Sequence, residues 1–154
     1  MGIGGFFDGI VLHQLLQWHH MVSETTPPNS LDNLEVNTVA DGFFHLSNWV
    51  LTLLGVGLLY RARRRLARPG SGRMLAGGIV AGWGLFNLVE GLIDHHLLNV
   101  HHVRPGPNEL LFDLGFLAWG AAMLVLGAWV YRQGARAGEQ LDESEPAEDV
   151  RSAA

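Results

Sequence analysis

Long apolar stretches alternate with short polar connections along this chain. Four of them, at about residues 2–22, 39–60, 74–100 and 110–131, each supply the ~20 residues that a helix needs to cross a bilayer. We therefore predict an all-α integral membrane protein with four transmembrane helices. The predicted membrane domain covers residues 1–133.

The polar segments differ in charge. The connection at 61–73 carries six of the ten basic residues, all of them Arg, and the positive-inside rule places it in the cytoplasm. Four crossings then put both termini in the cytoplasm, and the predicted location is the bacterial inner membrane. The stretch 134–154 is rich in Glu, Asp and Ala, so we expect it to be a disordered acidic cytoplasmic tail.

Composition narrows the classes of function. Of the 154 residues, 48% are hydrophobic and only 16% are charged, whereas soluble domains carry about a quarter charged residues. The absence of Cys excludes a disulfide scaffold, a zinc ribbon and a thiol nucleophile. We interpret the arginine run as a topology and lipid-headgroup signal, so the expected partner is the lipid bilayer and not nucleic acid.

An internal repeat is the strongest pattern in the sequence. DGIVLHQLLQWHHM, from Asp8 to Met21, aligns without a gap on EGLIDHHLLNVHHV, which begins at Glu90 and ends at Val103. The shared pattern is an acid followed by Gly, then His, then Leu-Leu, then His-His. We predict two repeated two-helix hairpins, residues 1–62 and 73–133, related by a pseudo-twofold axis along the membrane normal.

All eight histidines lie in or at the ends of the predicted spans. Ionisable side chains are rare in membrane helices and usually face the interior of the bundle. Neutral imidazole nitrogens beside carboxylate oxygens suit iron, copper or zinc. The candidate metal ligands are His13, His19, His20, Asp41, His45, His95, His96, His101 and His102, and Asp8 and Glu90 are the candidate catalytic, proton-handling residues.

Regular α-helical geometry predicts how these side chains are arranged. At about 100° per residue, Asp8 shares a stripe with His19, and His13 shares a second stripe with His20. The rise of 1.5 Å per residue places the double histidines near the outward surface and the single histidine of each repeat roughly 10 Å deeper. On this basis the predicted central ligands are His13, His20, His95 and His102, completed by Asp41 and His45.

The segments GGFFDGIVLHQLLQWHHM, ADGFFHLSNW and EGLIDHHLLNVHHVRPG resemble a family of small predicted bacterial membrane proteins of unknown function. That resemblance covers nearly everything before the acidic tail and implies a four-helix membrane protein without an assigned activity. The histidine motifs are more loosely similar to those of membrane desaturases and alkane hydroxylases, whose histidines are spaced differently. The spacing of Asp41 and His45 also resembles a copper site in the membrane subunit of particulate methane and ammonia monooxygenases.

Three functions fit these patterns. The leading hypothesis is a mononuclear or dinuclear non-haem metal centre near the outward face, holding iron, copper or zinc, for redox or oxygen-dependent chemistry. As an oxidoreductase it would take an apolar small-molecule substrate from the lipid phase or meet a redox partner, and a homodimer fits its small bundle. The alternatives are a transition-metal transporter or chaperone, and a haem-binding electron carrier with His13 and His95 as axial ligands.

Overall fold

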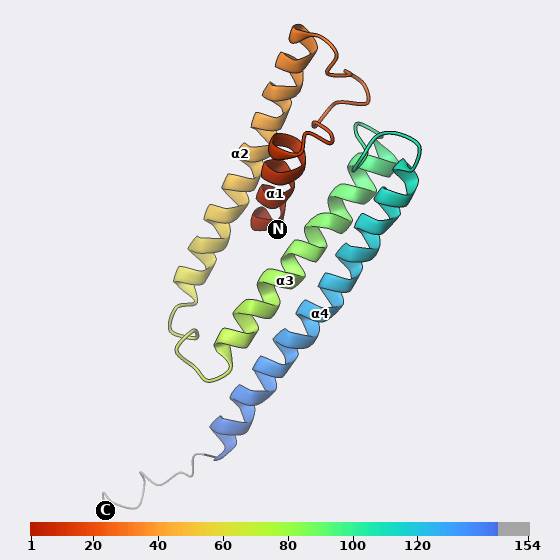
Figure 1. Cartoon of the computed structure of the whole chain (residues 1–154). Coiled ribbons are helices and arrows are strands. Elements are labelled where there is room, and N and C mark those ends of the chain that lie inside the picture. Colours follow the sequence, from red (N-terminus) through yellow and green to blue (C-terminus); the bar gives the residue numbers. More distant parts are fainter. Residues whose placement is uncertain (145–154) are drawn as a thin grey trace, which may run out of the picture.

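The computed structural model describes residues 1–144, which fold into helices joined by loops (Figure 1). No β-strand occurs within these residues. The elements, in chain order, are α1 (Gly2–Asp8), the π-helical segment η1 (Gly9–Leu15), α2 (Leu31–Arg61), α3 (Ser71–Glu90), the π-helical segment η2 (Gly91–Leu97) and α4 (Glu109–Ser144).

Three helical segments are long and apolar enough to cross a membrane: Leu31–Arg61, Ser71–Leu97 and Glu109–Gln140. The crossing predicted at residues 2–22 is not among them, because the first helix ends at Leu15. The seven residues of α1 and seven of η1 extend about 21 Å at the α-helical rise. The hydrocarbon core of a bilayer is about 30 Å thick, which is more than the length of residues 2–15 as a helix.

Helices α3 and α4 pack side by side along their length, whereas α1 lies between α2 and α3 (Figure 1). A Cβ atom at Gly77 would lie 2.6 Å from the carbonyl oxygen of Gly127, and one at Gly127 would lie 2.6 Å from that of Gly77. Small residues of this kind let membrane helices approach closely. Within the described residues, the backbone of α2 lies close to α1 and η1 but to neither α3 nor α4, and the Phe44 ring of α2 reaches the Phe86 ring of α3, with centroids 6.1 Å apart.

The interior of this fold is polar and its exterior is apolar. Among the residues whose burial the structure describes, 1–140, only three hydrophobic side chains are buried, whereas 38 large hydrophobic side chains are exposed. Hydrocarbon solvates an apolar exterior, and buried polar groups then need partners inside the protein. The buried polar residues are Asp8, His13, His19, His20, Asn37, Asp41, Asn48, Asn87, Glu90, His95, His101 and Asp113.

Two helix boundaries differ from those predicted. Helix α2 begins at Leu31 rather than at about residue 39, because the Ser30 side chain accepts a hydrogen bond from the Asn33 amide (3.2 Å) and caps it. Helix α4 continues to Ser144, so the expectation of a disordered tail beginning at residue 134 is wrong for its first part. Gly134 packs on the backbone of Gly70, and this contact stabilises α4 at residue 134. The rest of that tail, 145–154, lies outside the described residues.

Candidate metal centre

A widened turn brings an acid and a histidine together in each half of the chain. In an α-helix, residues five positions apart point about 140° away from each other. In η1 the Leu16 amide instead donates to the Val11 carbonyl oxygen (2.8 Å), a spacing of five residues. As a result, His13 Nε2 lies 3.2 Å from Asp8 Oδ2. The prediction that Asp8 and His13 occupy separate stripes is therefore wrong.

The second half repeats this local geometry. In η2 the Leu98 amide donates to the Ile93 carbonyl oxygen at 2.7 Å. The carboxylate of Glu90 lies at the start of the widened turn, and its Oε1 atom is 3.0 Å from His95 Nε2. Both segments are seven residues long, and each begins directly after the acid.

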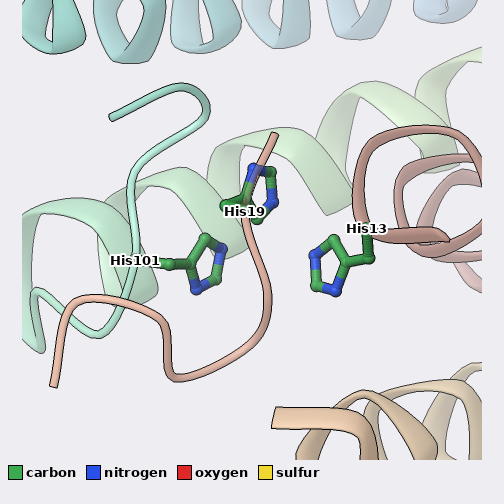
Figure 2. A group of neighbouring side chains, drawn as sticks. All are labelled: His13, His19 and His101. Carbon is green, nitrogen blue, oxygen red and sulfur yellow. The ribbon is translucent and has the colours of Figure 1, made fainter. Parts of the chain in front are cut away.

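The chain then turns back on itself after each π-helical segment. Gln17 and Asn99 have φ angles of 48° and 50°, in the left-handed region. The chain reversal places His19 and His101 back beside the two π-helical segments. Their rings stack on each other, with centroids 4.6 Å apart and an interplanar angle of 9°. Figure 2 shows these two rings facing the same space as His13.

The histidines form one cluster rather than two tiers. The ring centroids of His13 and His19 are 4.5 Å apart, and those of His95 and His101 are 4.8 Å apart. The predicted separation of roughly 10 Å assumed a straight helix, which in fact ends at Leu15. Two overlapping groups in the cluster could hold a metal ion: His13, His19 and His101, and Glu90, His95 and His101.

Three rings of the cluster are held through their Nδ1 atoms, whereas the Nδ1 atom of His95 has no hydrogen-bond partner within the described residues. His19 Nδ1 donates to the carbonyl oxygen of Val103 at 2.8 Å, and His101 Nδ1 donates to that of Met21 at 3.2 Å. These two hydrogen bonds cross between the halves of the chain. His13 Nδ1 donates to Asp41 Oδ1 at 2.8 Å, and His95 Nδ1 lies 3.3 Å from Asp113 Oδ1.

Asp41 and Asp113 play matching structural roles at the edge of the cluster. Asp41 also accepts hydrogen bonds from His20 Nδ1 (2.7 Å) and the Met21 amide (2.8 Å). Asp113 accepts from His102 Nδ1 (2.6 Å) and the Val103 amide (2.9 Å). Each carboxylate therefore ties the loop that follows a π-helical segment to the next long helix.

The Nε2 atoms face inward toward the two acids. Glu90 Oε1 lies 2.9 Å from His101 Nε2 as well as 3.0 Å from His95 Nε2. Buried polar atoms normally have a hydrogen-bond partner, yet five atoms on this cluster have none within the described residues. They are Asp8 Oδ2, His13 Nε2, His19 Nε2, Glu90 Oε2 and His95 Nδ1.

Burial keeps one imidazole of the cluster neutral. Desolvation, reinforced by the neighbouring rings of His101 and His13, lowers the pKa of His19 to about 2. His13 and His101 are both 0% exposed. The His13 ring is also covered by Phe44, whose ring stacks on it with centroids 5.2 Å apart. Solvent therefore has little access to the inward-facing nitrogens.

The other predicted ligands lie around or outside this cluster. His20 and His102 turn their Nδ1 atoms to Asp41 and Asp113 rather than toward the inner space. His45 is half-buried against Gly9 and stacks on Phe6 at 6.1 Å. His96 is exposed on η2. Neither His45 nor His96 belongs to the two groups that could hold a metal ion.

Sequence reasoning left some contributors out of the candidate set. Asp113 is one of them. The predicted helices at 39–60 and 110–131 are weakly similar to each other, and this similarity aligns Asp113 with Asp41. Gln14 is another, because its Nε2 atom donates to Asp41 Oδ2 at 3.2 Å. The carbonyl oxygens of Met21 and Val103 carry no side-chain signal, so no motif could have identified them.

Comparison with known proteins places the chain in a family. The family described as "Predicted membrane protein (DUF2243)" matches residues 1–134, and the chain belongs to it. No curated protein and no solved structure matches the chain. Family membership confirms the resemblance carried by the repeated motifs, and together with the three apolar helices it identifies a membrane protein.

Proposed function

We propose that this protein is an integral membrane metalloprotein with a non-haem transition-metal centre. The ligands are the Nε2 atoms of four histidines and the carboxylates of two acids, namely His13, His19, His95, His101, Asp8 and Glu90. The centre carries out redox or oxygen-dependent chemistry on a small apolar molecule taken from the bilayer. Asp41 and Asp113 orient ligands, and His20 and His102 hold those two carboxylates in place.

One observation carries the proposal: the rings of His13, His19 and His101 each donate a hydrogen bond through the outward-facing Nδ1 atom. A neutral imidazole that donates through Nδ1 presents a lone pair at Nε2. The Nε2 lone pair of His101 lies 2.9 Å from Glu90 Oε1, and that of His13 lies 3.2 Å from Asp8 Oδ2. A lone pair and a carboxylate oxygen at such a distance repel unless a proton or a metal ion lies between them, and the proposed metal ion takes that place. Hydrogen bonds from Nδ1 to a carboxylate or a carbonyl oxygen are typical of metal-ligating histidines.

The donor set bears on which metal is bound and how many ions. Imidazole nitrogen and carboxylate oxygen without thiolate suit iron, copper and zinc. Six donors exceed the four of a tetrahedral site, so the centre takes either one six-coordinate ion or two ions. The two overlapping groups, which share His101, support two ions. The number of ions per chain distinguishes these cases.

Asp8 and Glu90 lie where they can hold a proton next to the ligands. Each has one buried carboxylate oxygen without a partner in the described residues, Asp8 Oδ2 and Glu90 Oε2. When the neighbouring histidine nitrogens bind a metal ion, each of these two oxygens can accept a proton. This arrangement supports the assignment of both residues to proton handling, in addition to ligation.

A cavity supports an apolar substrate. It measures about 200 Å³, lies between α2 and α3, and has Glu90 among its lining residues. Most of its lining is apolar, and Asp94 contributes a second carboxylate next to Glu90. The apolar part is formed by Met1, Phe44, Leu51, Phe86, Val89 and Ile93. Such a lining admits a small hydrocarbon or dioxygen from the lipid phase more readily than it admits a polar solute.

The same geometry favours a permanently bound metal ion over bound haem and over an ion in transport. The His19 and His101 rings link those of His13 and His95 in a continuous series of contacts, in the space that haem would need between two axial ligands. Complete burial of His13 and His101 favours an ion that stays over one in transit. The matched contacts of the two halves support a pseudo-twofold arrangement, with the arginine-rich connection in the cytoplasm and the cluster near the outward face.

Elemental analysis with an optical spectrum tests the proposal. The protein is purified in mild detergent without chelators and then reconstituted separately with iron, copper and zinc. We expect one or two ions per chain and no Soret band. Absence of bound metal after all three reconstitutions would overturn the metal centre, and a Soret band would replace it with haem.

Adjacent histidines provide matched variants. His95→Ala removes a buried ligand and should abolish tight binding, whereas His96→Ala changes the neighbouring exposed ring and should leave the metal content unchanged. His19→Ala and His20→Ala form a second pair. Greater metal loss in His20→Ala than in His19→Ala would restore the ligand set predicted from helical periodicity.

A further inference from the structure

The two acids of the cluster differ by one methylene group and in what they reach. Glu90 Oε1 lies 2.9 Å from His101 Nε2 and 3.0 Å from His95 Nε2, so this carboxylate contacts two rings. Within the described residues, the carboxylate of Asp8 forms an ion-pair contact with His13 alone, at 3.2 Å. One C–C bond less shortens the side chain of Asp by about 1.5 Å. The two halves therefore match in residue pattern but differ in the reach of their acids.

Asp8 is the one proposed ligand that lies outside both groups that could hold a metal ion. One group contains Glu90 together with two rings. The other consists of His13, His19 and His101, and Figure 2 shows these three imidazoles around one space. The acid of the second half thus belongs to a ligand group, whereas the matching acid of the first half does not.

The three-imidazole group offers a metal ion at most three donors. Each of its rings donates a hydrogen bond through Nδ1 to a carboxylate or carbonyl oxygen, so one nitrogen per ring is left for the ion. His19 is only 2% exposed, yet its Nε2 atom has no partner within the described residues. Metal sites with three protein ligands keep a further position for water or substrate. The position next to these rings is therefore the one that an outside ligand can take.

We propose that Asp8 is a displaceable ligand of the metal centre and that a small outside molecule takes its coordination position. The exchange rests on the metal centre proposed above. One donor leaves the ion and another replaces it, and no electron is transferred in this step. Glu90 stays bound, because its carboxylate contacts two ligand rings, whereas Asp8 contacts one and its Oδ2 atom has no hydrogen-bond partner within the described residues.

Burial of the rings limits the size of the outside ligand. His13 and His101 are 0% exposed, and the Phe44 ring stacks on His13 with centroids 5.2 Å apart. Closely packed side chains leave little free space in a protein interior. A molecule of two or three atoms, of the size of dioxygen or azide, meets this limit, whereas an organic substrate does not.

Azide tests the exchange, because its binding to Cu(II) produces a charge-transfer absorption band. The full chain in mild detergent is loaded with Cu(II) and titrated with azide, and the wild-type protein should bind it saturably. Asp8→Glu keeps the charge and adds one methylene group, so that the carboxylate reaches the ion. The azide affinity should then fall about tenfold or more, because a tethered donor competes with a free one, while the copper content stays unchanged. Asp32→Glu, at an exposed position in the first turn of α2, is the matched control.

Asp8→Asn tests the same position without lengthening the side chain. A neutral amide is a weaker metal ligand than a carboxylate, so azide should displace it more readily and bind more tightly than to the wild-type protein. The two variants therefore shift the azide affinity in opposite directions. A general disturbance of the site would shift both in the same direction, and helix content from circular dichroism confirms that each variant is folded.

The outcomes separate this exchange from the metal centre itself. Copper-loaded wild-type protein that binds no azide would overturn the exchange and leave the metal centre in place. Equal azide affinity in the wild type, Asp8→Glu and Asp8→Asn would do the same, because the ligand would then occupy a position that Asp8 does not control. Absence of bound copper, iron and zinc would overturn the metal centre, and the exchange with it.

Discussion

Replacing Asp41 by Asn tests whether this carboxylate sets the metal affinity without touching the metal. Asp41 accepts four hydrogen bonds, from His13 Nδ1, His20 Nδ1, Gln14 Nε2 and the Met21 amide. The side chain of Asn is nearly the same size but has one acceptor oxygen and one donor nitrogen. The substitution therefore changes hydrogen bonding and charge while leaving the packing almost intact.

The hydrogen bonds around Asp41 give the expected magnitude. Its Oδ1 atom serves His13 and the Met21 amide, and its Oδ2 atom serves His20 and Gln14. In Asp41→Asn the remaining oxygen faces the Met21 amide, because that amide cannot rotate away. His13 then donates to a neutral acceptor, and hydrogen bonds to a neutral group are roughly half as strong as those to a carboxylate. Loss of such a partner lowers metal affinity about 10- to 100-fold, or about 1.4 to 2.7 kcal/mol.

Competition titrations measure the effect. Cu(II) and Zn(II) are titrated separately into wild-type and Asp41→Asn protein against a chromophoric chelator. Asp32→Asn is the control, because Asp32 is exposed in the first turn of the same helix. Equal dissociation constants for wild type and Asp41→Asn, with both proteins folded, would refute the orienting role of Asp41.

Two other predictions concern pH and helix packing. Lowering the pH from 7 to 5 should weaken metal binding, by up to about tenfold per pH unit for each ligand imidazole that takes up a proton in that range, because a protonated imidazole cannot ligate. His19, whose pKa is lowered to about 2, should add nothing to this loss; a dissociation constant independent of pH would contradict imidazole ligation. Gly77→Ala should destabilise the fold by about 1 to 3 kcal/mol, since its Cβ atom would lie 2.6 Å from the Gly127 carbonyl oxygen, whereas at Gly78 a Cβ atom meets nothing within 4 Å. Unfolding of both variants in detergent measures the difference, and equal stability would show that α3 and α4 move apart at no cost.

Hydrophobic patterning predicted the three long helices because bilayer thickness imposes a minimum length on an apolar segment. The same rule failed at residues 2–22, where apolar side chains continue beyond the end of the helix. Leu15 and Leu16 are exposed rather than internal, so a count of apolar residues cannot detect that the helix ends there. The left-handed residues offered unequal signals: Asn99 is a residue type enriched in that conformation, whereas Gln17 is not.

Motif comparison found the chemical groups of the candidate centre, but helical periodicity assigned their partners incorrectly. The repeat identified the acids and histidines because the residue types recur at equal spacing. Their arrangement depends on hydrogen bonds between residues five apart in η1 and η2. No residue type predicts such a π-helical turn. One extra residue per turn rotates His13 onto Asp8 and His95 onto Glu90. The sequence pattern associated with this geometry is an acid followed five residues later by a histidine, and it occurs in both halves of the chain.

The short first helix links these features. A helix that crossed the whole bilayer would carry the double histidines out to the far surface, away from His13. Ending at Leu15 leaves enough chain for the loop to return through Gln17 and place His19 against His13 and His101.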